Sequence, residues 1–278
     1  MAYDFDGELA WGAQVSEDPG THRFGSGSSL LLYANLVIVP ASVECEAILA
    51  FDAASGREVW RAPAEGYGAW WSTPILAKVG DRTELIVSVP DEVWGLNPDN
   101  GKLRWYSECD SDRALSPSVV LQNDVVYAMG GSRGWSMAVR TGGRGDVSKS
   151  HVVWTSRQGS YVPSPVVVGD HLYWGDDRGH ARCSSTKTGE LGYRERLPYP
   201  GPVYASALGA DGKIYAVTRH KGTFVLAAKT SFEVLSHNVF ESDESDFNAS
   251  PAVSNGRLLL RSDQALYCIG RPRKTKSF

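Results

Sequence analysis

The stretch Ala47–Arg61, AILAFDAASGREVWR, carries the clearest structural signal in the chain. An apolar run leads into a polar turn that contains Gly56, and a second short run ends with Trp60. A close copy follows at Glu92–Tyr106, EVWGLNPDNGKLRWY, with its glycine and tryptophan at matching places. Because glycine supplies the positive φ that a tight reversal needs, each stretch is predicted to be a β-hairpin.

A second kind of unit, two short apolar runs around a polar turn, alternates with these hairpins. Four of its six copies begin with Ser-Pro or Thr-Pro, and proline is tolerated at the first residue of a strand. The copies align on Ser29, Thr73, Ser116, Ser164, Ser206 and Ser250. Successive aligned positions are 42 to 48 residues apart, which is typical of a four-stranded propeller blade.

The repeat therefore predicts an all-β fold, a β-propeller of four-stranded antiparallel blades. Six blades are the leading count, and part of a seven- or eight-bladed propeller is the alternative. Each blade alone exposes two sheet faces, which are buried only by packing against neighbouring blades. We expect a single propeller domain over residues 1–270, followed by a basic disordered tail over residues 271–278.

The tryptophans at the ends of the hairpins are expected to wedge the outer strand of each blade against the next blade. An aromatic side chain buries roughly 150–250 Å², so such docking is a large part of the contact between blades. The expected docking residues are Trp11, Trp60, Trp105 and Trp154. A long connection, Thr141–His151, precedes the strand of Trp154, and two weaker copies carry Tyr193 and Leu235 at the tryptophan position.

Composition argues against several classes of function. With 28 basic and 32 acidic residues the formal net charge is -4, whereas nucleic-acid and membrane-surface binding normally need a basic field. We therefore expect no nucleic-acid partner. No apolar stretch reaches the length of a transmembrane segment, and the acidic start Met1–Asp6 is unlike a signal peptide. The four cysteines are scattered, without the spacing of a zinc or thioredoxin-type motif.

The hairpin sequences AFDAASGREVW and GLNPDNGKLRW resemble the tryptophan-docking repeats of the pyrroloquinoline-quinone-like (PQQ-like) propeller superfamily. The order of the copies and the segment GRGDVSKSHVVWTS resemble a bacterial branch of PQQ-like repeat proteins, over about residues 4–270. The superfamily includes quinone-dependent alcohol and sugar dehydrogenases, and also non-catalytic relatives such as an outer-membrane protein-assembly lipoprotein. The resemblance implies a periplasmic or extracellular location.

The two ends of the repeat are incomplete. Members of that branch are longer at the N-terminus, whereas residues 2–14 here are predicted to be a third strand, a turn and a fourth strand. The last unit, Ala265–Gly270, stops after its third strand. Residues 9–15 are therefore expected to supply the missing fourth strand and to close a six-bladed ring, which removes an exposed sheet edge. In the alternative, the chain is part of a longer propeller.

The sequence lacks the residues that the resemblance associates with quinone chemistry. The enzymes of the superfamily hold the quinone between a tryptophan and a vicinal disulfide, with calcium and a catalytic aspartate. This chain has no adjacent cysteine pair and no matching set of calcium ligands, so we predict no cofactor, no metal and no catalytic residue. The six histidines lack metal-ligand spacing. Asp4–Glu8 is expected to form a hairpin turn and not a calcium loop. Glu241–Asp246 is expected to be a solvated loop. The tripeptide Arg144–Asp146 matches an adhesion motif, and we interpret the match as chance.

One set of residues favours binding. In a propeller, the segment between the last strand of one blade and the first strand of the next crosses one face toward the central channel, and loops on a rigid scaffold usually carry function. These inter-blade segments carry aromatic and charged residues of the kind that anchor partners. The residues are His22, Arg23, Phe24, Trp70, Trp71, Asp112, Arg113, Tyr161, Tyr204, Phe247 and Asn248. In the alternative, the aromatic residues fill the channel or cover the tops of the blades. Replacing Trp70 and Trp71 by alanine is expected to weaken binding and to leave the fold intact.

The leading functional hypothesis is a monomeric, non-catalytic binding or scaffold propeller that recognises a protein, a peptide or a glycan through these segments. A quinone-dependent dehydrogenase, or its degenerate descendant, is the second hypothesis. A propeller enzyme that acts on polysaccharide is the third. The absence of a recognisable catalytic motif favours the first.

Overall fold

β-Strands form nearly all of the regular structure of the chain. The computed structural model describes residues 1–16, 24–111, 114–132, 134–199 and 201–270, and the predicted tail, residues 271–278, lies outside them. The single helical turn in this part of the chain, α1 (Ser42–Cys45), is far too short to cross a membrane, and no other described segment is a membrane-spanning helix. The all-β prediction is confirmed.

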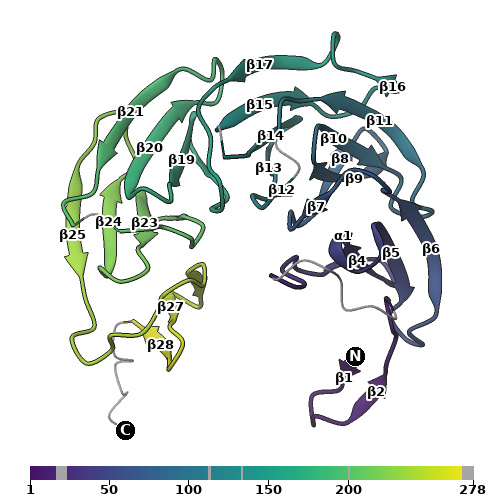
Figure 1. Ribbon diagram of the computed structural model, residues 1–278, viewed down its shortest axis with the longest axis horizontal. Helices are drawn as coiled ribbons and strands as arrows, with labels where there is room; N and C mark the ends of the chain where they lie inside the picture. Colours follow the sequence, from purple (N-terminus) through teal and green to yellow (C-terminus); the bar gives the residue numbers. More distant parts are fainter. Residues whose placement is uncertain (17–23, 112–113, 133, 200, 271–278) are drawn as a thin grey trace, which may run out of the picture. The chain divides into compact units, whose positions relative to one another are not determined.

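The chain divides into two compact units. The first unit contains residues 1–161 and 187–189, and the second contains residues 162–186 and those from 190 onward. In both units each four-stranded sheet is an antiparallel meander, in which strands adjacent in sequence are adjacent in the sheet (Figure 1).

The first unit contains an N-terminal hairpin, three large sheets and a short pair of strands. The hairpin consists of β1 (Ala2–Tyr3) and β2 (Leu9–Trp11). The first sheet contains β3 (Leu31–Tyr33), β4 (Leu36–Ala41), β5 (Ala47–Asp52) and β6 (Glu58–Pro63). The second contains β8 (Ile75–Val79), β9 (Arg82–Val89), β10 (Glu92–Leu96) and β11 (Leu103–Glu108). The third contains β13 (Val120–Gln122), β14 (Val125–Gly130), β15 (Trp135–Arg140) and β17 (Val152–Ser156). The short strands β7 (Ala69–Trp70) and β12 (Ala114–Leu115) pair in parallel.

The second unit contains three sheets, of which the last has three strands. The first contains β18 (Val166–Val168), β19 (His171–Gly175), β20 (His180–Ser185) and β21 (Leu191–Arg196). The next contains β22 (Leu208–Ala210), β23 (Lys213–Val217), β24 (Thr223–Ala227) and β25 (Val234–Asn238). The last contains β26 (Ala252–Ser254), β27 (Arg257–Arg261) and β28 (Leu266–Ile269). The strands at the two ends of the chain follow the expected pattern, while ring closure through residues 9–15 and the count of six blades stay predictions.

The long connection after β15 adds a fifth strand to the second sheet. This strand, β16 (Gly145–Asp146), runs parallel to β11. The Val147 amide donates to the Tyr106 carbonyl at 2.9 Å, and the Glu108 amide donates to the Ser148 hydroxyl at 2.9 Å. The connection thus covers the outer edge of the second sheet, which would otherwise present unpaired backbone groups.

The apolar core of each unit lies between the facing surfaces of its sheets. Burial alternates along outer strands such as β6, as it must when one face of a strand is packed and the other is solvated. In the first unit the core includes Ile38, Ile48, Ile86, Trp105, Leu115 and Met137. In the second unit it includes Tyr173, Cys183, Ile214, Phe224 and Leu226.

Tryptophan side chains join neighbouring sheets by lying on glycines. Trp60 of the outer strand β6 donates from Nε1 to the Pro98 carbonyl at 3.0 Å, in a turn of the next sheet. The same turn contains Gly101 with a φ of +68°, and a Cβ there would lie 2.5 Å from Cε3 of Trp60. Both the backbone angle and the indole therefore require glycine at this position.

The same contact recurs at two other tryptophans of the first unit. Trp11 lies on Gly56 and donates to the Ala53 carbonyl at 2.9 Å. Trp154 lies on Gly189, where a Cβ would come within 2.5 Å of the indole. Trp11 and Trp60 thus sit on the glycine that ends the turn between the third and fourth strands of the following sheet.

Trp105 makes a different contact. Its indole is fully buried and donates from Nε1 to Glu84 Oε2 at 2.8 Å. The same oxygen accepts the Gly142 amide at 3.1 Å, and the guanidinium of Arg82 lies 2.9 Å from Oε1. A buried carboxylate with a cationic partner therefore replaces the turn carbonyl at this junction, and it also anchors the start of the long connection.

Hydrogen bonds between equivalent residues join the starts of the first strands. In each bond the backbone amide two residues before one sheet donates to a hydroxyl at the equivalent position before the next sheet. The bonds run from Ser29 to Thr73 (3.0 Å), Thr73 to Ser118 (2.9 Å), Ser164 to Ser206 (3.0 Å) and Ser206 to Ser250 (2.9 Å). The alignment on Ser116 is therefore wrong by two residues, because the hydroxyl that takes part belongs to Ser118.

We expect Gly101→Ala to destabilise the protein more than Gly80→Ala. Both glycines have positive φ, but no atom lies within 4 Å of a Cβ at Gly80. Gly80→Ala should cost about 1–2 kcal/mol for the left-handed backbone, and Gly101→Ala about 1–3 kcal/mol more, because the methyl group displaces the Trp60 indole. Urea unfolding of the two variants measures the difference. Equal losses would show that the indole contact contributes nothing.

Candidate functional site

The structure places the predicted binding residues in two separate groups. Trp70, Trp71, Phe24 and Tyr161 belong to the first unit, and Tyr204, Phe247 and Asn248 belong to the second. The other predicted residues, His22, Arg23, Asp112 and Arg113, lie outside the described residues.

Trp70 is a core residue and does not face a ligand. Its side chain is 1% exposed, and its backbone amide donates to the Ser42 hydroxyl of α1 at 2.7 Å. Pairing of β7 with β12 sets Trp70 opposite Leu115, another fully buried residue. The expectation that Trp70 is a binding residue is therefore wrong, because its indole is buried in the core between the sheets.

Trp71, the next residue, is partly exposed and belongs to a small aromatic group. Its Nε1 donates to the Gly25 carbonyl at 2.8 Å. Phe24, whose side chain is largely exposed, meets Trp71 edge to face, with ring centroids 5.9 Å apart and planes at 83°. Tyr161 is also exposed. These side chains remain accessible to a partner.

We expect Trp70→Ala to destabilise the protein by about 3–5 kcal/mol, because it leaves a large cavity in the core. Phe24→Ala should cost about 1 kcal/mol or less, since it removes only one edge-to-face contact at the surface. Thermal or urea unfolding of the two single variants measures this contrast. A Trp70→Ala protein as stable as the parent would mean that the indole is not part of the core.

In the second unit, Tyr204 lies beside a charged cluster that the sequence analysis missed. The guanidinium of Arg219 lies 5.5 Å from the centroid of the Tyr204 ring. Arg219 donates from Nε to Asp246 Oδ2 at 2.8 Å and also from Nη2, while His220 Nδ1 lies 3.2 Å from Asp246 Oδ1. The hydrogen bond from Arg219 lowers the pKa of the Asp246 carboxyl. A third of the Arg219 side chain is still exposed, so the cluster can meet a partner.

Phe247 supports this cluster from within. It is buried and belongs to a group of three stacked rings with Phe240 and Tyr267, of which Phe240 and Tyr267 have centroids 3.8 Å apart. The Phe247 ring thus packs against the last sheet and also borders the hollow described below, so its part in binding stays a prediction. Asn248, the residue after it, is exposed.

Backbone hydrogen bonds fix the segments of the cluster to one another. The Arg219 amide donates to the Pro202 carbonyl at 2.9 Å, and the Phe247 amide donates to the Arg219 carbonyl at 3.0 Å. The Asp263 amide donates to the Asp246 carbonyl, also at 3.0 Å. The connections between the second and third strands of a sheet thus pair with the segments between sheets. In a four-stranded meander both kinds of connection lie at the same end of the sheet. Arg219 lies between the second and third strands of its sheet, so this rule could have identified it from the sequence.

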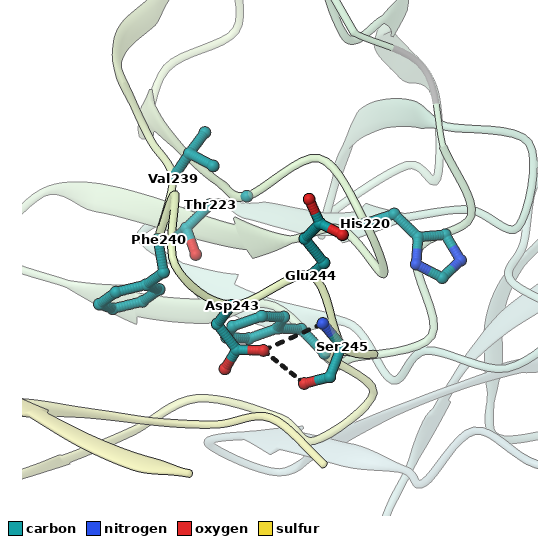
Figure 2. Close-up of a pocket in the computed structure, with 9 residues that line it drawn as sticks. His220, Thr223, Val239, Phe240, Asp243, Glu244 and Ser245 are labelled. Atoms are coloured by element: carbon teal, nitrogen blue, oxygen red, sulfur yellow. Dashed lines mark hydrogen bonds between the residues drawn. The ribbon is translucent and has the colours of Figure 1, made fainter. Parts of the chain in front are cut away.

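A small hollow lies beside the cluster (Figure 2). It encloses about 330 Å³, part of which is open solvent, and its lining includes His220, Thr223, Val239, Phe240, Glu244 and Phe247. In Figure 2, Asp243 turns toward Ser245, whereas the Glu244 side chain extends in a different direction.

Asp243 is a buried carboxylate bound by hydroxyl groups. It accepts from Ser245, through the amide at 3.0 Å and the hydroxyl at 2.5 Å. Its other oxygen accepts the hydroxyls of Ser262 and Tyr267, each at 2.6 Å. These hydrogen bonds, with that of Ser245 foremost, hold the pKa of the Asp243 carboxyl far below its ordinary value. The segment Glu241–Asp246, expected to be a solvated loop, is thus fastened to the last sheet through Asp243.

The free energy of unfolding should fall in acid partly through Asp243. The folded-state pKa lies below the unfolded value of about 3.9, so the contribution is present above that pH and is lost as the pH falls through the folded pKa. We expect Asp243→Asn to be less stable near neutral pH and to show a flatter decline below about pH 4. Urea midpoints between about pH 7 and pH 2 measure the slope, with Asp263→Asn, an exposed carboxylate, as the matched control. Identical slopes for the parent and both variants would contradict this role.

The described residues do not fit the quinone site that the resemblance implies for the enzymes. They contain no group of three or more His, Cys, Asp or Glu side chains that could hold a metal ion. The four cysteines are free thiols, and none is adjacent to another in sequence. The tripeptide Arg144–Asp146 is exposed, and the Asp146 carboxylate accepts both the amide and the hydroxyl of Ser148.

Comparisons with known proteins support the fold and point to one family. The family model described as outer membrane protein assembly factor BamB matches residues 1–192. The crystal structure of BamB from Moraxella catarrhalis is 14% identical, with a TM-score of 0.66 over 87% of this chain and 71% of that one. The crystal structure of the computationally designed Ika8 protein is 12% identical, with a TM-score of 0.51 over 84% of this chain and 79% of that one. A search of curated protein sequences gave no match. The PQQ-like propeller fold is thereby confirmed.

Proposed function

The chain belongs to the family of the outer membrane protein assembly factor BamB, and we propose that it is a non-catalytic, protein-binding propeller of the bacterial cell envelope. The name of the family supports a protein partner over a glycan, since assembly factors act on other proteins. The face that carries the inter-blade segments is proposed to bind this partner, and the monomer is proposed to be the functional form. The misfit of the described residues to a quinone site favours this function over a dehydrogenase.

The observation that carries the proposal is the guanidinium of Arg219 held over Tyr204 and against Asp246. Tyrosine and arginine are enriched among the residues that dominate binding energy at protein interfaces. The guanidinium is held in place by its ion pair and by the ring, so little side-chain entropy is lost when a partner docks. It remains partly exposed and can still donate to acceptors on another protein.

Site-specific photo-crosslinking tests the proposed face. A photoreactive phenylalanine derivative replaces Tyr204 in one variant and Leu235, an exposed residue of the outer strand β25, in the other. In cells that make the full chain, we expect a discrete protein adduct from position 204 and none from position 235. Equal adducts from both positions, or none from position 204, would overturn the proposal.

Arg219→Ala is expected to weaken formation of the complex captured at position 204 by about tenfold or more. The substitution removes a charge-assisted hydrogen-bond donor and leaves the Asp246 carboxylate without its arginine partner. Lys213→Ala is the matched control, since Lys213 also pairs with an aspartate, Asp211, but is the first residue of β23 and lies outside the cluster. Binding of the purified variants to the captured protein measures the change. A loss of the same size in both variants would point to a general charge effect.

A further inference from the structure

We infer that the hollow beside Glu244 receives a lysine or arginine side chain of the protein partner. The inference rests on the proposed function and adds the chemistry of one contact. Two observations support it: the state of each carboxylate around the hollow and the apolar side chains in its walls.

Of the two carboxylates that line the hollow, Asp243 and Glu244, only Glu244 is free to bind a cation. It is exposed at the hollow, and no hydrogen bond or ion pair joins it to another described residue. The other carboxylates nearby are already engaged, Asp243 by the hydroxyls of Ser245, Ser262 and Tyr267, and Asp246 by Arg219 and His220. An incoming ammonium or guanidinium group would therefore pair with the carboxylate of the described lining that has no partner.

The local charge favours a cation over an anion. Asp243 is held in its ionised form by four hydrogen bonds, none of which comes from a cationic group. The charge of Arg219 is already compensated by Asp246. An acidic side chain entering the hollow would thus meet Asp243 and Glu244 without a free cation among the described lining residues.

The walls suit the long aliphatic stem of a basic side chain. Val239 is half exposed and Phe240 is partly buried, and both line the hollow together with Thr223. Lysine and arginine bury their methylene groups along apolar surface while the charged end remains beside polar groups. An aromatic ring near the charged end adds a favourable contact with a cation.

Capped pentapeptides Gly-Gly-Xaa-Gly-Gly test the inference with the full-length chain. Xaa is lysine in the probe, norleucine in the control that keeps the stem without the charge, and glutamate in the control of opposite charge. Methyl signals of Val239 in a valine-labelled protein report on occupancy by nuclear magnetic resonance. We expect saturable shifts with the lysine peptide and affinities at least about tenfold weaker with norleucine and glutamate.

Two variants of the same loop separate a specific contact from general charge. Glu244→Gln should weaken lysine-peptide binding by about tenfold, whereas Glu241→Gln, an exposed residue outside the lining, should change it by less than about twofold. Equal binding of norleucine and lysine, or equal effects of the two variants, would overturn the inference. If the lysine peptide fails to bind while crosslinking at position 204 persists, only this inference falls. If the peptide binds while crosslinking fails, the proposed function falls.

Discussion

The contact between an indole and a glycine is the interaction on which the first unit depends. A propeller sheet has two faces and no stable existence alone, so each junction must bury apolar surface and also fix the sheets in one relative position. Trp60 on Gly101 does both. The indole supplies a large apolar area, and its N–H binds a carbonyl of the same turn. A methyl group at Gly101 would occupy the space of the Trp60 ring, so the tryptophan contact requires glycine at that position.

The hydroxyl bonds at the starts of the first strands act at the opposite edge of each sheet. An outer strand is held by an indole, and a first strand is held by an amide-to-hydroxyl bond such as that from Ser29 to Thr73. Two separated attachments prevent the rotation of one sheet on the next that a single contact would allow. At Thr73 and Ser250 the hydroxyl accepts such a bond and the next residue is a proline, which lies just before the strand, where its missing N–H costs no ladder bond.

The sequence predicted the scaffold better than the site, for a physical reason. The tryptophan and the turn glycine recur at a fixed spacing, so the hairpins around Trp60 and Trp105 could be recognised from the sequence alone. Trp70 and Trp71 are adjacent in an irregular segment, where no periodicity tells which of the two points inward. The structure buries the first and leaves the second partly exposed. The Ser116 alignment failed for a related reason, since Leu-Ser-Pro-Ser offers two hydroxyls two residues apart and only pairing selects Ser118.

Arg219 illustrates how such a scaffold builds a surface from residues that no motif marks. Its backbone amide and carbonyl bind two different inter-blade segments, and its guanidinium then joins Tyr204 and Asp246 from those same segments. The side chain is thus held in place by backbone bonds that depend only on the course of the chain, which the sheets determine. If the cluster binds a partner as proposed, substitutions in its exposed part would change what is recognised without disturbing the indole and hydroxyl contacts that hold the sheets. Binding to a surface prepared in this way loses little conformational entropy, so few contacts are needed for a specific complex.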